Sequence, residues 1–171
     1  MEKNVKDNKE IIQEITINGL LAALYVVFTV AISPLSYGPI QFRISEIFVL
    51  FAFFNKRYTI GLTLGCLIAN IFSPTAALDI PFGTVATLLA CIGIMFSKQL
   101  IVAILFPIVF NAFIIAGELN LYGIPYWYSV GWIALGETVV LVAGYIIFFL
   151  LRKNQYFFKA IRATQNTDFK F

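Results

Sequence analysis

Long apolar stretches recur along most of this chain, and they decide the solvent in which it can fold. Of its 171 residues, 60% are hydrophobic and only 12% are charged, and the mean hydropathy is +0.88. A soluble domain is about half apolar and about a quarter charged, and a chain of this length cannot bury so much apolar surface in one aqueous core. We therefore predict an all-α integral membrane protein, with the lipid bilayer among its partners.

Six stretches predict transmembrane helices, because about 20 apolar residues cross a bilayer as a helix. The second begins somewhere in Gln41–Ser45, and the expected spans are Ile15–Ile32, 41–54, Tyr58–Phe72, Phe82–Phe96, Leu100–Leu119 and Tyr126–Leu151. They form one compact six-helix bundle over residues 15–151, between an N-terminal segment, 1–14, and a tail, 152–171. A cleaved signal peptide is the alternative for the first span, but the mixed charges of residues 1–14 and the length of the stretch oppose it.

The basic residues give this bundle an orientation. With six spans, eleven of the twelve Lys and Arg residues fall on the side of the two termini, and only Arg43 falls on the other side. Cytoplasmic loops carry the excess of basic residues in membrane proteins. Both termini are therefore expected in the cytoplasm, with the protein in the plasma membrane.

The second, third and fourth spans are short. At about 14–16 residues each reaches only about 21–24 Å, against a hydrocarbon core about 30 Å thick. Their cytoplasmic turns are tight, so we expect the loops at residues 33–42 and 73–81 to dip inward from the outer side. Irregular backbone at membrane depth is tolerated where protein or water satisfies it, which predicts an outward-facing pocket.

Polar side chains within the apolar stretches are the candidates for that pocket, because ionisable groups inside a membrane are costly and are retained for function. Most of them map to the outer half of the predicted bundle. The candidate substrate-binding residues are Gln41, Arg43, Glu46, Asn70, Asp79, Asn111, Glu118 and Glu137.

Each candidate also has an interpretation without a ligand. Arg43 and Glu46 lie three residues apart and could pair with each other, and Asp79 could cap the helix that follows it. The two asparagines could bond neighbouring helices, and the two glutamates of the last spans could face water. Seven of the eight converge on the outer side of the membrane, with Asn111 near the middle of its span, and this convergence favours a binding site.

The charge of the candidate site indicates the ligand. Four carboxylates stand against one guanidinium, which favours a cation or a ligand rich in hydrogen-bond donors over a phosphate or a carboxylate. Aromatic residues near the site belong to an interfacial belt, or one or two of them stack on a flat heterocycle.

Other classes of function lack their residues. The chain has no histidine and no Gly-rich phosphate loop, HExxH or GxSxG motif, so we expect no enzyme activity, no metal site and no cofactor. Cys66 and Cys91 lie in apolar runs and are interpreted as small buried side chains. There is no basic stripe for a nucleic acid, and any ATP hydrolysis is expected in partner subunits.

Small residues recur at four-residue spacing on two spans, and such rows let helices approach closely. The third span carries Gly61, Gly65 and Ala69, which favours packing within the subunit. The first span carries Gly19 and Ala23, with Ala22 beside them. As an end helix, it could present this row to a partner subunit.

The most specific motifs resemble the QueT family, the substrate-binding S components of energy-coupling factor transporters that take up queuosine precursors. The matching segments are Tyr37–Glu46, Gly65–Asn70, Asp79–Thr84 with Ala86-Thr87, Phe110–Ala112, Glu118 and Gly136-Glu137. The resemblance implies a six-helix S component with cytoplasmic termini, an outward pocket, a transmembrane coupling subunit and two ATPase subunits. It also implies that Gly19, Ala22 and Ala23 contact the coupling subunit.

The ligand that the resemblance implies, a deazaguanine base, suits the candidate residues. Its ring N–H and exocyclic amine could both donate to one carboxylate, its carbonyl suits Arg43, Gln41 or an asparagine, and an aminomethyl substituent would use a second carboxylate. We expect Glu46, Asp79 and Glu137 to include the carboxylate that binds the base, and Glu118, nearest the water, to matter less. An S component for another vitamin-like heterocycle, a membrane enzyme with paired carboxylates and a purely structural membrane protein stay open.

Overall fold

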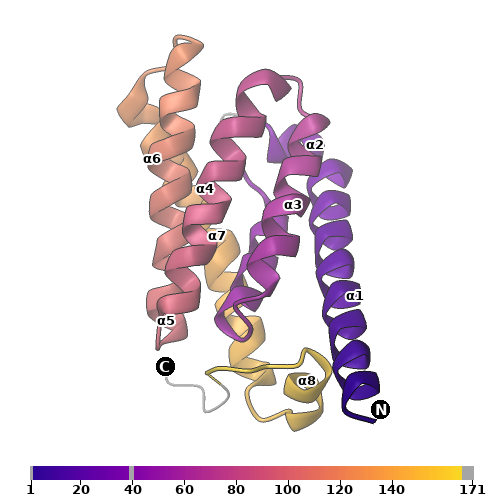
Figure 1. Cartoon of the computed structure of the whole chain (residues 1–171). Coiled ribbons are helices and arrows are strands. Elements are labelled where there is room, and N and C mark those ends of the chain that lie inside the picture. Colours follow the sequence, from indigo (N-terminus) through magenta and orange to yellow (C-terminus); the bar gives the residue numbers. More distant parts are fainter. Residues whose placement is uncertain (1, 39–40, 167–171) are drawn as a thin grey trace.

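A computed structural model describes residues 2–38 and 41–166, and its helices account for most of this part of the chain (Figure 1). No strand occurs within these ranges, which confirms the predicted all-α class. The elements are α1 (Glu2–Ala31), α2 (Ser33–Ser36), the 3₁₀ helix η1 (Ile44–Phe53), α3 (Tyr58–Ile71), α4 (Ala76–Phe96), α5 (Leu100–Ala103), α6 (Leu105–Leu121), α7 (Tyr126–Leu151) and α8 (Gln155–Ala160).

Four helical segments are long and apolar enough to cross a membrane. They are Glu10–Ala31, Ala76–Phe96, Leu100–Leu121 and Tyr126–Leu151. The remaining two predicted spans correspond to η1 and α3, which are apolar but have only 10 and 14 residues. The chain is thus a multi-pass membrane protein, and the crossing of η1 and α3 stays a prediction.

The predicted loop at residues 73–81 is wrong in most of its length. Helix α4 begins at Ala76, so Pro81 lies inside it and Asp79 lies in its first turns. Pro81 is the sixth residue of α4, beyond the first four residues whose N–H groups have no acceptor within the helix, so it removes one intrahelical hydrogen bond there. The side chains of Ser73 and Thr75 turn the chain and bond Asp79 instead. Sequence reasoning read Pro81 as a boundary, but this helix tolerates it.

The second predicted helix is a 3₁₀ helix of ten residues, although such runs rarely exceed 3–4 residues. Side chains three residues apart lie above one another in this geometry, and Glu46, Val49 and Ala52 form a buried row. At about 2.0 Å per residue the helix extends about 20 Å. Near its start, Thr29 of α1 donates a 2.7 Å hydrogen bond to Ser45.

The helices pack in the order α1 on α3, α3 on α4, α4 on α6 and α6 on α7, with η1 contacting α1, α3, α4 and α7. Gly61 and Gly65 let α3 approach α1 closely. The backbone N–H of Gly61 donates to Asn18 of α1 at 2.8 Å, and a Cβ on Gly65 would lie 2.9 Å from the Cα of Ala22. The interpretation of the Gly61, Gly65 and Ala69 row as packing within the subunit is confirmed.

The tail folds back under the bundle, which composition did not predict. Asn166 donates to the carbonyl of Phe53 at 2.8 Å and to that of Ser97 at 3.2 Å, and the N–H of Thr164 donates to Phe54 at 2.9 Å. Helix α8 and the first described turns of α1 lie at the same end of the molecule (Figure 1). We call this the tail end, comprising α8, residues 161–166 and the turn at 54–57. The opposite end comprises α2 and the turn at 72–75.

Candidate functional site

The eight candidate side chains are all buried, with at most 5% of their surface exposed. Gln41 and Arg43 precede η1, and the others belong to helices: Glu46 to η1, Asn70 to α3, Asp79 to α4, Asn111 and Glu118 to α6, and Glu137 to α7. The interpretation of Glu118 and Glu137 as water-facing charges is therefore wrong, because they are 0% and 2% exposed. The expectation that Glu118 lies nearest the water stays a prediction, because all four carboxylates are buried.

Arg43 is the one cation of this group. Its Nε donates to the carbonyl of Ser36 at 3.2 Å, and its guanidinium lies 5.7 Å from the centre of the Tyr37 ring. The described ion pairs lie elsewhere, at Glu14–Arg57 and Glu10–Arg162. Arg43 and Glu46 therefore form no direct ion pair within 4.0 Å in the described structure, although the charge of Arg43 acts on all four carboxylates.

Gly83 of α4 makes room for the polar groups beside it. A Cβ at this position would lie 2.5 Å from Nδ2 of Asn70 and 3.5 Å from Nη1 of Arg43. The Asn70 amide donates to the backbone carbonyl of Asp79 at 2.8 Å. The interpretation of Asn70 as a link between helices is confirmed for its nitrogen, while its oxygen has no partner.

The side-chain hydrogen bonds of Ser73 and Thr75 to Asp79 both go to one of its two carboxylate oxygens. Thr75 donates to its Oδ2 at 2.7 Å, and Ser73 donates to the same oxygen. The expectation that Asp79 caps α4 is wrong, because the N-cap position belongs to Thr75. Its carboxyl lies beside that of Glu118, which comes from the last turn of α6.

Two further carboxylates are each bonded through one oxygen. Asn111 donates to Oε1 of Glu137 at 2.9 Å, joining α6 to α7, so the predicted helix-linking role of Asn111 is confirmed. The phenol of Tyr25 donates to Oε1 of Glu46. Sequence reasoning missed Tyr25. Its four-residue spacing with Leu21 and Thr29, which are also buried, was the available signal.

Unpaired buried atoms concentrate in this cluster. Among the eight side chains, seven acceptor oxygens and one donor nitrogen have no hydrogen-bond partner: Gln41 Oε1, Glu46 Oε2, Asn70 Oδ1, Asp79 Oδ1, Glu118 Oε1 and Oε2, Glu137 Oε2 and Arg43 Nη2. A buried unpaired polar group costs about 1–3 kcal/mol. The unpaired atoms of the cluster therefore match a compact group that brings many donors and one acceptor.

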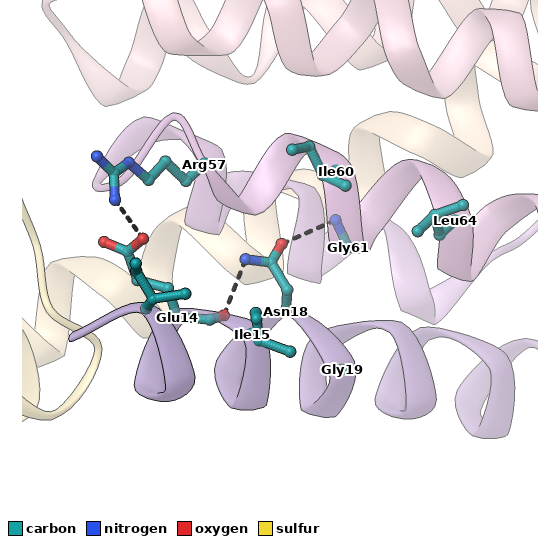
Figure 2. A pocket seen from close by; sticks show the side chains of 9 residues that line it. Glu14, Ile15, Asn18, Gly19, Arg57, Ile60, Gly61 and Leu64 are labelled. Atoms are coloured by element: carbon teal, nitrogen blue, oxygen red, sulfur yellow. Dashed lines mark hydrogen bonds and ion pairs between the residues drawn. The ribbon is translucent and has the colours of Figure 1, made fainter. Parts of the chain in front are cut away.

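The small-residue row of α1 divides between two faces. Ala22 packs against Gly65, whereas Gly19 and Ala23 are exposed, and a Cβ on Gly19 would meet nothing within 4 Å. Beside Gly19, a groove of about 580 Å³ runs between α1 and α3, bordered by the Glu14–Arg57 ion pair and by Ile60 (Figure 2). The part of the row available to a partner is thus Gly19 and Ala23.

Cys66 and Cys91 are free and buried, as predicted, and Cys66 accepts a hydrogen bond from Thr87 at 3.1 Å. The described residues contain no group of three or more side chains able to hold a metal ion.

Several apolar helices around a buried polar cluster with unpaired acceptors define a multi-pass membrane protein with a candidate binding site. Residues 15–153 match the family model described as QueT transporter. A relative from Lactococcus lactis subsp. cremoris (strain MG1363), named "Queuosine precursor transporter QueT", is 38% identical over 152 residues, which cover 79% of this chain and 89% of the relative. The chain belongs to the QueT transporter family. No solved structure matches it significantly.

Proposed function

We propose that this chain is the substrate-binding S component of an energy-coupling factor transporter and that it imports a queuosine precursor with a deazaguanine base. The observation that supports the ligand is the excess of seven unpaired buried acceptor oxygens over one unpaired donor. A deazaguanine presents a ring N–H and an exocyclic amine on one edge, so a carboxylate accepts both in a bidentate pair. Its carbonyl accepts from Arg43 Nη2.

In this proposal the base binds near the ends of the helices, beside the ring of Tyr37. Tyr37 is held by a 2.6 Å hydrogen bond from its hydroxyl to the carbonyl of Ala69, and it stands beside Arg43. Burial raises the pKa of Tyr37, so its phenol stays neutral. A neutral ring next to the guanidinium offers a stacking surface for a flat heterocycle.

The proposed orientation places the tail end in the cytoplasm of the cell and the polar cluster toward the outside. Basic residues lie in the tail end, at Lys56-Arg57, Lys159 and Arg162, and in the turns that precede α5 and α8, at Lys98 and Arg152-Lys153, which fits the excess of positive charge on cytoplasmic segments. In this arrangement η1 and α3 complete six crossings over residues 15–151, with residues 1–14 and 152–171 in the cytoplasm of the cell.

The proposed partners are a transmembrane coupling subunit and two ATPase subunits. The sequence holds no phosphate-binding loop of its own, so ATP hydrolysis is assigned to the partners and no enzyme activity to this chain. The coupling subunit contacts the face of α1 that carries Gly19 and Ala23. Leucine at either position is expected to weaken docking while ligand binding persists.

Equilibrium binding tests the ligand assignment. The purified chain in detergent is titrated calorimetrically with queuine, 7-aminomethyl-7-deazaguanine and 7-cyano-7-deazaguanine, and with riboflavin and biotin as other vitamin-like heterocycles. At least one deazaguanine is expected to bind, and the two vitamins are not. Binding of a vitamin with no binding of any deazaguanine would replace the proposed substrate by the alternative one.

A further inference from the structure

We infer that Asp79 and Glu118 together form a subsite for a cationic group of the ligand, such as the ammonium of an aminomethyl substituent. This inference rests on the proposed function, because it concerns how the same site selects its substrate. It assigns to Glu118 a larger role than its sequence position indicated.

The two carboxyl groups come from helices that pack against each other. Asp79 lies in the first turns of α4 and Glu118 in the last turn of α6, and their carboxyls adjoin. One turn further along, Phe82 of α4 packs into the apolar cluster that holds Ala116 of α6. The pair is therefore built by the α4–α6 packing and not by a flexible loop.

Three oxygens of this pair lack a donor. Both oxygens of Glu118 are unpaired although its side chain is fully buried, and Asp79 keeps Oδ1 unpaired while Ser73 and Thr75 occupy Oδ2. A primary ammonium carries three N–H donors and no acceptor. The number and the type of the unpaired atoms match that group.

The charge of the surroundings leads to the same ligand. Arg43 is the one guanidinium in the cluster, and it acts on Glu46 and Glu137 as well as on this pair. Two adjacent buried carboxylates repel each other unless a proton or a cation lies between them. A proton shared between the two carboxyls relieves that repulsion while no ligand is bound, and a bound ammonium takes its place and satisfies more of the unpaired oxygens.

A neutral substituent fits poorly at the same place. The nitrogen of a nitrile is an acceptor, so a cyano-deazaguanine would direct a lone pair at three unpaired oxygens. A cationic deazaguanine would place charge-assisted hydrogen bonds there, which are about twice as strong as neutral ones. The subsite thus separates two ligands that share one base.

The test compares the two ligands on one protein and its variants. Dissociation constants for 7-aminomethyl- and 7-cyano-7-deazaguanine are measured by calorimetry on the full chain, on Glu118→Gln and on the control Glu14→Gln, which makes the same change at the exposed Arg57 pair. The parent is expected to bind the aminomethyl ligand more tightly. Glu118→Gln should lose roughly 30- to 4000-fold for that ligand, the range expected for loss of a buried charged partner, while binding of the cyano ligand is unchanged or improved.

The outcomes separate the inference from the proposed function. The control should keep the parent's ratio of the two constants. Equal affinity of the parent for both ligands, or an equal loss of both in Glu118→Gln, overturns the inference and leaves the transport assignment standing. Binding of the cyano ligand that rises with sodium concentration, with choline chloride as the substitute salt, also overturns it, because the pair would then hold an inorganic cation. Failure of the parent to bind any deazaguanine refutes the proposed function itself.

Discussion

Replacing Gly61 with alanine probes the closest approach between α1 and α3. A Cβ at this position would lie 2.5 Å from the backbone oxygen of Asn18 and 2.9 Å from its Cα. An ordinary contact begins at 3.4 Å, so α1 would have to move by about 0.9 Å. Two of the three nearest atoms are backbone atoms, so a change of the Asn18 rotamer moves only its Oδ1, at 2.7 Å, and gives partial relief.

The energetic effect follows from two opposing contributions. Overpacking costs about 1–3 kcal/mol, and the short contacts with backbone place Gly61→Ala near the upper value. Alanine in a helix gains about 1 kcal/mol over glycine. The net loss is about 2 kcal/mol, which corresponds to a fall in Tm of about 4–8 °C for a chain of this size.

The assay is thermal unfolding of the purified protein in detergent, followed by a thiol-reactive dye or by circular dichroism. Gly19→Ala is the matched control, because it makes the same substitution on the other helix of the groove where a Cβ meets nothing within 4 Å. Its Tm is expected to stay level or to rise by about 2–4 °C. Equal shifts in the two variants would show that the α1–α3 contact is not as close as described.

Three further changes test other parts of the structure. With both native cysteines buried, Asn120→Cys is expected to react with an impermeant maleimide on intact cells and Lys56→Cys only after lysis; the reverse pattern would invert the proposed orientation. Asn166→Gly tolerates the positive φ of this residue but removes both hydrogen bonds to the carbonyls of Phe53 and Ser97, and a Tm lower by about 4–8 °C is expected, at about 1 kcal/mol per bond. Tyr25→Phe deprives Glu46 of its donor and should lower the Tm by about 2–12 °C; an unchanged Tm would mean that this bond adds nothing to stability.

The apolar periodicity of the sequence located most of the fold. The last span was predicted at Tyr126–Leu151 and has those bounds, because a polar turn and a basic pair flank a continuous apolar run. The start of α4 was predicted wrongly because side-chain hydrogen bonds, and not the proline in the sequence, set where this helix begins. Ser73 and Thr75 start α4 ahead of Pro81, and no propensity rule anticipates the bonds they make to Asp79.

The candidate site was predictable as a set of residues but not as a network. Polar side chains inside apolar stretches are rare, so all eight could be found from their positions in the sequence, and each is buried. Which oxygen is bonded and which is left unpaired depends on distant partners such as Tyr25 and Asn111. The burial of Glu118 was misjudged, because the distance of a residue from the end of a span says nothing about the helices that cover it.

The 3₁₀ geometry of η1 has a consequence for aligning and engineering this segment. Ten residues at about 2.0 Å each cover about 20 Å, whereas an α-helix at about 1.5 Å per residue needs about 13 residues for the same distance. A segment of this length would fall about 5 Å short if it were redesigned as an α-helix, and Glu46 would then be drawn away from Tyr25 or the carbonyl of Phe53 from Asn166. Three inserted residues restore the length. They also turn the buried row that begins at Glu46 onto another face of the helix. A simple exchange of helix type therefore cannot keep both the length of the segment and the direction of its buried side chains.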